Sequence, residues 1–213
     1  MHSLPKAAAM AYRAAMAAKN GSEGQGTRDK LIDAAFRAVA RDGLADTNVK
    51  SIAAEAGVNP GLLHYHFASK DALLEAAIES ASARYMAEID ALIATTPRAR
   101  LFDAYVAFAA ATLDANRDLF RVRLALGARA MNDARLAARL EIGNAAVRER
   151  LATVFAAGAG RSVPDDRDRL RARATKAAFE GMMLSWLTNP DFPMRAVLGE
   201  WAEGMRAVLH KPG

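Results

Sequence analysis

The sequence predicts an all-α protein of about nine helices. Hydrophobic residues make up 52% of the 213 residues, and aromatic residues only 7%. The hydrophobic residues recur at spacings of three and four, alanine is abundant, and runs of β-branched residues are nearly absent, all of which favour helices over strands. Turn and capping residues divide the chain into a flexible tail (1–26), a small three-helix domain (27–72) and a larger helical domain (73–213).

Residues 47–70 carry the clearest signal, which is that of two short helices joined by a tight turn. Asn48 is placed to cap the first helix, ahead of an apolar stripe at helical spacing. Gly57 follows that helix, where a left-handed backbone favours glycine. Asn59 and Pro60 then supply a cap and a first-turn proline for the second helix. Two helices joined in this way form a helix-turn-helix unit.

The second helix of this unit presents one face to the protein and others to solvent. Leu63 and Phe67 lie four residues apart and anchor the inner face. Gly61, Leu62 and Tyr65 are therefore left on the outer faces. In helix-turn-helix units the N-terminal end of this helix enters the DNA major groove. We expect Leu62 to contact a thymine methyl group, and Gly61 to let the backbone approach the bases.

This stretch resembles the signature of the tetracycline-repressor (TetR) family of bacterial transcription regulators. The matching positions, in unbroken order, are Thr47, Asn48, Val49, Lys50, Ile52, Ala53, Ala56, Gly57, Val58, Asn59, Gly61, Leu63, Phe67, Ser69 and Lys70. One position departs, because the family usually has a phosphate-binding tyrosine where His64 stands. A histidine can still donate one hydrogen bond when neutral and two when charged. The resemblance covers residues 27–75; beyond them it extends only to an all-helical layout.

The resemblance implies a homodimer that binds an inverted-repeat operator in double-stranded DNA, in the bacterial cytoplasm. A small molecule held in the second domain would release the DNA, and a long helix over residues 70–94 would couple the two domains. We expect no cofactor apart from this unidentified small-molecule effector. The candidate DNA-contacting residues are Asn48, Lys50, Ser51, Asn59, Pro60, Gly61, Leu62, His64, Tyr65 and Lys70.

The distribution of charge leaves a second hypothesis open. The chain has a net charge of +5, yet residues 27–94 carry seven Lys/Arg against ten Asp/Glu. This acidic balance and His64 favour a helical small-molecule sensor or carrier that acts through protein partners without binding DNA. The tail is expected to be a solvated extension, the alternative being a basic arm in which Lys6, Arg13 and Lys19 reach DNA.

The sequence shows no pattern for catalysis, for a metal site or for a membrane span. The absence of cysteine excludes disulfides and thiol chemistry. His64 and His66 lie two residues apart, about 200° around a helix, so they cannot share one ion. Neither a phosphate-binding glycine loop nor a catalytic triad is recognisable. The longest charge-free stretches are about half the ~20 residues that a membrane helix needs. We therefore rank an enzyme third among the hypotheses.

The remaining elements follow from capping and breaking residues. Thr27 is expected to cap a helix over 28–42 that Gly43 ends. This helix would pack against the helix-turn-helix unit and support it. Thr96 and Pro97 are expected to cap and begin the first helix after the long one. Further helices are expected at about 98–115, 117–130, 133–157, 165–188 and 194–209.

Large side chains in the second domain indicate a ligand pocket and a dimer interface. The candidate pocket residues are Phe102, Tyr105, Phe108, Phe120, Arg123, Phe179 and Met183. An aromatic stripe at this spacing is more often plain core, and Glu180 nearby would suit a cationic ligand or simply be solvated. In the family that the chain resembles, the last two helices form a four-helix bundle with the same two helices of the second subunit. The candidate interface residues are Met182, Trp186, Leu198, Trp201 and Met205, which would otherwise close the core of the monomer.

Overall fold

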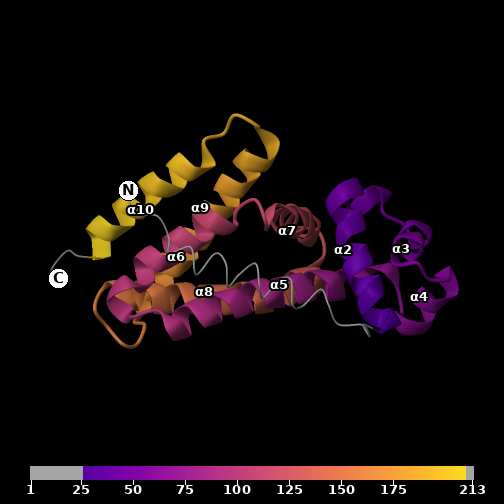
Figure 1. The fold of residues 1–213 in the computed structure, drawn as a ribbon, viewed down its shortest axis with the longest axis horizontal. Coiled ribbons are helices and arrows are strands. Elements are labelled where there is room, and N and C mark those ends of the chain that lie inside the picture. The colour runs from indigo at the N-terminus through magenta and orange to yellow at the C-terminus, as the bar shows by residue number, and fades with distance from the viewer. Residues whose placement is uncertain (1–25, 210–213) are drawn as a thin grey trace.

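A computed structural model of the chain describes residues 26–209, and all its regular elements are helices, as predicted (Figure 1). The helices of this range are α2 (Thr27–Asp46), α3 (Val49–Ala56), α4 (Pro60–His66), α5 (Lys70–Thr95), α6 (Arg98–Thr112), α7 (Arg117–Ala130), α8 (Ala134–Gly158), α9 (Asp166–Thr188) and α10 (Met194–Leu209). None of these helices is long and apolar enough to cross a membrane. The predicted tail and its basic arm lie outside the described residues, apart from Gly26.

The molecule is elongated, with α2, α3 and α4 gathered at one end and α10 lying toward the other (Figure 1). We call the α2–α4 unit the reading head. Helix α5 follows α4 after a link of three residues and runs from the head along the larger helical domain, in contact with α8. A single uninterrupted helix therefore connects the two parts, as the sequence predicts.

Two main hydrophobic cores hold these helices together. The first includes Leu31 of α2, Leu63 of α4 and Leu126 of α7, so it joins the head to the larger domain. The second includes Ile89 of α5 and Phe155 of α8, and it fills the far half of the molecule. Because the first core crosses the predicted boundary at residue 72, the head packs against the larger domain and its orientation depends on that contact.

The predicted caps fix where the helices of the head begin. Asn48, Asn59 and Ser69 each accept a hydrogen bond from a backbone N–H in the first turn of the helix that follows, at 3.0, 2.8 and 3.1 Å respectively. Gly57 ends α3 with a φ of 67°, a left-handed conformation that a residue with Cβ rarely adopts. Pro60 is the first residue of α4. These local predictions are confirmed.

Two predicted helix starts are wrong. Thr27 is already helical, and Gly26 occupies the cap position without a side-chain hydrogen bond. Thr96 ends α5, and Pro97 occupies the cap position of α6 because its ψ of 135° is not helical. Gly43 does break the first helix, with a φ of 83°, although the helical assignment continues for three residues beyond it.

Candidate nucleic-acid interface and ligand cavity

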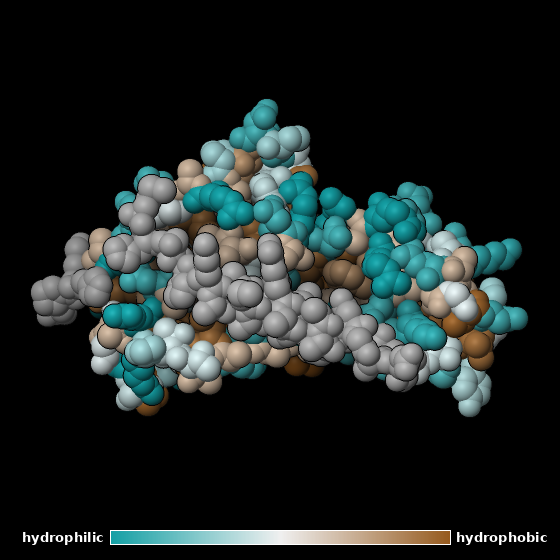
Figure 2. Space-filling model, viewed as in Figure 1, coloured by the Kyte–Doolittle hydropathy of each residue, from teal (hydrophilic) through white to brown (hydrophobic). Residues whose placement is uncertain are grey.

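Helix α4 has the inner and outer faces that the sequence predicts. Leu63 is fully buried, and Phe67, just past the helix end, is 6% exposed. Leu62 is 39% exposed and Tyr65 is 81% exposed, so both reach solvent. Figure 2 shows hydrophobic surface at this end of the molecule. The other candidate residues exposed on or just before α4 are Asn59, Pro60, Gly61 and His64.

The two histidines of α4 do not form a metal site. His66 packs its ring edge-on against Tyr65, with ring centroids 5.0 Å apart, while His64 is exposed. Among the described residues, no group of three or more His, Cys, Asp or Glu side chains lies close enough to hold an ion. His64 is thus exposed at the position where the resemblance implies a phosphate contact.

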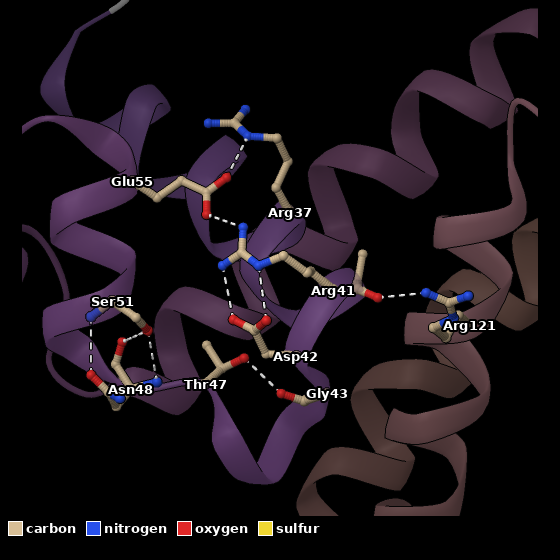
Figure 3. Close-up of polar contacts among 10 residues, drawn as sticks. Arg37, Arg41, Asp42, Gly43, Thr47, Asn48, Ser51, Glu55 and Arg121 are labelled. Atoms are coloured by element: carbon tan, nitrogen blue, oxygen red, sulfur yellow. Dashed lines mark hydrogen bonds and ion pairs between the residues drawn. The ribbon is translucent and has the colours of Figure 1, made fainter.

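Asn48 and Ser51 cap one another at the start of α3 (Figure 3). The Ser51 N–H donates to Asn48 Oδ1 at 3.0 Å, and the Asn48 N–H donates to Ser51 Oγ at 3.2 Å. The Ser51 hydroxyl also donates to the Asn48 carbonyl at 2.8 Å. These bonds engage the Ser51 hydroxyl and the side-chain oxygen of Asn48. The side-chain nitrogen of Asn48, Nδ2, is left as the donor for an external partner. Lys50, between them, is exposed.

Lys70 occupies a position that differs from the predicted phosphate contact. Its half-buried ammonium donates to the carbonyl of Leu44 at 3.2 Å and to the carbonyl of Thr47. Both carbonyls lie in the segment between Gly43 and α3. In the chain without DNA, Lys70 therefore clamps the inside of the head, and its phosphate contact stays a prediction. Sequence spacing could not reveal this, because the contact joins residues 23 and 26 positions apart.

Two arginines of α2 neutralise an acidic residue of α3 (Figure 3). Arg41 Nη1 lies 2.7 Å from Glu55 Oε2, and Arg37 Nε lies 3.0 Å from Glu55 Oε1. The hydrogen bond from Arg41, followed by that from Arg37, lowers the pKa of Glu55. Arg41 also pairs with Asp42 at 2.8 Å. Part of the acidic charge of the head is therefore paired with arginines of the head itself and does not face a binding partner.

Helix α7 contacts the head through a polar bond as well as through the core (Figure 3). Arg121 of α7 donates to the carbonyl of Ala40 in α2 at 2.7 Å. The buried Thr47 hydroxyl donates to the carbonyl of Gly43 at 2.6 Å. These donors satisfy carbonyls near the break in α2, where regular helical hydrogen bonding is interrupted. No local sequence signal identifies Arg121, because its partner lies 81 residues away.

A cavity of about 90 Å³ lies between helices α5 to α9. The predicted pocket residues that line it are Tyr105, Phe120, Arg123, Phe179 and Met183. Phe102 does not, because it is buried in the second core with its ring 6.2 Å from that of Phe155. Phe108 does not either, and it stacks on Tyr85 at 5.9 Å. Steps of three residues drift by about 60° around a helix, so one of these three α6 aromatics faces the cavity.

The cavity also has walls that the sequence did not identify. These are Ser82, Tyr85, Met86, Leu119, Val147, Leu151, Thr175, Lys176 and Glu180. A second cavity of about 430 Å³ shares four residues with the first: Phe120, Arg123, Glu180 and Met183. Ligand sites usually measure roughly 300–1,000 Å³. The first cavity alone is therefore too small for a molecule of ordinary size, whereas the second is large enough, and movement of the shared side chains would join the two spaces.

The predicted dimer residues on α9 and α10 are mostly directed into the chain itself. Trp186 is 9% exposed and packs under Arg117, whose guanidinium lies 4.3 Å from the ring centroid. Leu198 is 1% exposed. Trp201 packs on Phe102 and edge-on against Phe179. Placing Trp186 and Leu198 in an interface is therefore wrong, because periodicity marks an apolar face without saying what covers it. The remaining two, Met182 and Met205, are half-buried against the cores of the monomer.

Different apolar residues of α9 reach solvent. Leu170 is 66% exposed and Leu184 is 54% exposed. Between them the exposed small residues Ala174, Ala177 and Gly181 continue the same face at spacings of three and four. The spacing of these residues is a periodic signal in the sequence, but their small side chains mark an interface less clearly than tryptophan does.

The chain matches two known families and several solved structures. Residues 31–77 match the family described as bacterial regulatory proteins, tetR family, and residues 97–207 match the one described as BetI-type transcriptional repressor, C-terminal. The HTH-type transcriptional regulator BetI of Stenotrophomonas maltophilia is 32% identical over 171 residues, which are 74% of this chain and 79% of that protein. BetI of Brucella anthropi is 40% identical over 76 residues, 35% of this chain and only 39% of the relative's own length.

The structural neighbours share the fold at lower identity. A TetR transcription regulator from Haloarcula marismortui superposes with a TM-score of 0.74 at 21% identity, covering 85% of this chain and 97% of that one. The regulator FadR from Bacillus subtilis, solved in complex with stearoyl-CoA, gives 0.70 at 18% identity over 85% and 98% of the two chains. A helix-turn-helix head joined by one helix to a larger helical domain is the fold that the chain shares with these solved transcription regulators. Within this class of regulators, the chain belongs to the tetR family of bacterial regulatory proteins.

Proposed function

We propose that this protein is a sequence-specific DNA-binding repressor of transcription that a small molecule releases. The observation that carries the proposal is the orientation of α4. Leu63 and Phe67 hold its inner face in the core, so that Leu62 and Tyr65 project from the end of the molecule. An exposed helix end of this kind is what the major groove admits. The contacts that position the protein on phosphates would come from Lys50, His64 and the first backbone N–H groups of α3.

The proposed active form is a homodimer that pairs α9 and α10 with their copies. The exposed face of α9 from Leu170 to Leu184 supports this assembly, because small residues between two leucines allow close helix approach. Two heads related by a twofold axis would read an inverted repeat whose half-sites lie one helical turn apart or a multiple of it. Such a protein acts where the chromosome lies, which for a bacterium is the cytoplasm.

The proposed release mechanism is a shift between two populations of head orientation. Residues of α5, including Ser82 and Tyr85, line the cavity, and the same helix follows α4 after a three-residue link. A ligand that fits the cavity better in the DNA-incompatible orientation would lower DNA affinity by its differential affinity for the two states. No chemical step is involved. The alternative of a sensor without DNA binding is not favoured, because the relatives are named transcription regulators.

Selection of bound duplexes tests the proposal. The full chain is incubated with random-sequence DNA, and the bound fraction is sequenced and titrated at several salt concentrations. We expect an enriched inverted repeat and a specific affinity at least about 10³-fold above that for non-specific DNA. Equal affinity for all duplexes, or no measurable binding at low salt, contradicts DNA recognition and leaves the carrier alternative.

A further inference from the structure

The charges around the cavity do not cancel. Lys176 and Glu180, one turn apart on α9, form an ion pair with each other at the cavity wall. Arg123 has a different environment. Its Nη2 donates to Asn144 Oδ1 at 2.7 Å and its Nη1 donates to Ser82 Oγ at 3.2 Å, and both acceptors are neutral. The cavity wall therefore carries one positive charge in excess of its internal pairs.

The guanidinium of Arg123 is held in a poorly solvated place. Burial lowers its pKa, and the charge of Glu180 acts in the opposite direction at longer range. A buried charge that has only neutral partners is destabilising, so the site gains when an anion arrives. A cation would instead meet the repulsion of Arg123, and the acidic group that would attract it is already paired with Lys176.

One buried polar group of the cavity wall has no hydrogen-bond partner among the described residues. It is the hydroxyl of Thr175, a residue that is 1% exposed and lines the cavity. Tyr105 also lines it, and burial raises the pKa of its hydroxyl, which stays protonated at neutral pH and able to donate. The remaining walls are apolar or aromatic, with Phe120, Phe179 and Met183 the largest.

We propose that the effector of this protein is a small amphipathic carboxylate, whose carboxylate pairs with Arg123 and accepts from Thr175 while its apolar body lies among the aromatic walls. The proposal rests on the proposed function, since it names the ligand of the same release site. A planar guanidinium matches a carboxylate in two parallel hydrogen bonds. The second cavity, which shares Arg123 and Phe120, supplies the extra room for the apolar body.

Calorimetric titration of the full chain with three matched probes tests the ligand class. The probes are 3-phenylpropionate, 3-phenylpropanol and 3-phenylpropylamine, which share a carbon skeleton and differ in the charge of the head group. We expect the carboxylate to bind at least about 10-fold more tightly than the amine or the alcohol. Equal binding of all three, tighter binding of the amine, or no heat from the carboxylate at about 10 mM would overturn the proposal.

Variants assign the preference to the cavity. Arg123→Met should weaken carboxylate binding roughly 10- to 100-fold, while Arg123→Lys should retain part of it. Arg167→Met, which removes an equal charge from an exposed site on α9, should bind like the wild type. Thr175→Val keeps the shape and removes the unpaired hydroxyl, so it should fold normally and bind several-fold more weakly. Wild-type affinity in both Arg123→Met and Thr175→Val would overturn the proposal.

The same preparations are titrated with selected duplex DNA in the absence of probes. DNA binding together with a failed carboxylate preference refutes the ligand class alone. A carboxylate preference without DNA binding refutes the repressor and leaves the cavity assignment intact. Melting curves of each variant identify any loss of binding that comes from unfolding.

Discussion

Arg129 of α7 donates two hydrogen bonds to Asp71 in the first turn of α5, at 2.9 and 2.6 Å. One turn further along α5, Arg139 of α8 pairs with Glu75 at 3.4 Å and with Glu79 at 2.6 Å. The first turns of α5, which follow α4 in the chain, are thus held by arginines from two helices that line the ligand cavities. We expect movement of α7 or α8 to reach the reading head through these pairs.

The first prediction concerns this pair. Arg129→Gln should leave the free energy of unfolding within about 1 kcal/mol of the wild type, because both side chains are more than 40% exposed and such pairs are weak. DNA affinity without ligand should nevertheless change by roughly 2- to 30-fold, because the pair biases head orientation. Denaturant titration and DNA titration measure the two effects.

A matched control for Arg129 exists at the far end of α5. Arg150 donates two hydrogen bonds to Asp90, at 2.7 and 2.6 Å, within the larger domain. Arg150→Gln removes a similar pair away from the head and should leave DNA affinity unchanged. If both variants change DNA affinity equally, the Arg129 pair has no special role in coupling.

The second prediction uses two aromatic residues of the head that differ in burial. Tyr65→Ala removes a ring that is 81% exposed, so the free energy of unfolding should stay within about 0.5 kcal/mol while DNA site preference changes. Phe67→Ala removes a ring that is 6% exposed and should cost about 3–5 kcal/mol. Thermal melting and duplex selection on both variants check this. A strongly destabilised Tyr65→Ala variant would mean that α4 is packed the other way.

Local sequence signals were sufficient for the positions of the helices but not for the contacts between them. Asn48, Gly57 and Asn59 act on residues within three positions of themselves, so their roles were readable. Lys70 and Arg121 bind carbonyls that folding brings near, and no spacing rule finds such partners. For the same reason, the cavity was predicted in part: the residue types were right, and the helix faces that converge on it were not known.

The third prediction separates a clamp from a phosphate contact. Lys70→Met leaves the carbonyls of Leu44 and Thr47 without their donor and should destabilise the head by about 1–3 kcal/mol. Lys50→Met, at an exposed position, should leave stability unchanged and reduce the salt dependence of DNA binding by about one phosphate contact. Melting curves and salt titrations distinguish them. A stable Lys70→Met protein with a reduced salt slope would support the phosphate contact instead.

The fourth prediction is a pH dependence of stability that comes from Glu55. Its pKa is lowered in the folded protein, chiefly by the hydrogen bond from Arg41. The stabilisation is therefore complete above the unfolded value of about 4.3 and is lost as pH falls through the lower folded value. Glu55→Gln should be less stable than the wild type at pH 7, and the difference should shrink in acid. Denaturation across pH measures this; a constant difference at all pH values would contradict it.

The fifth prediction concerns the proposed dimer. Leu184→Asp places a charge at the exposed apolar face of α9, and in a twofold dimer it does so twice. Full burial of a leucine contributes about 1.5–3 kcal/mol, so loss of two should weaken association by roughly 100-fold or more. Sedimentation velocity over a range of concentrations should show a monomer where the wild type is dimeric. DNA affinity should fall in parallel, because one head contacts one half-site.

Ile142→Asp is the control for this experiment, since Ile142 is a 74% exposed apolar residue on α8, outside the proposed interface. It should leave both the oligomeric state and the melting temperature unchanged. Leu198→Asp should instead unfold the monomer, because that side chain is 1% exposed within the chain's own core. If Leu184→Asp stays dimeric while Ile142→Asp dissociates, the copies meet through α8, and the two heads would have to be placed on the operator by a different twofold axis.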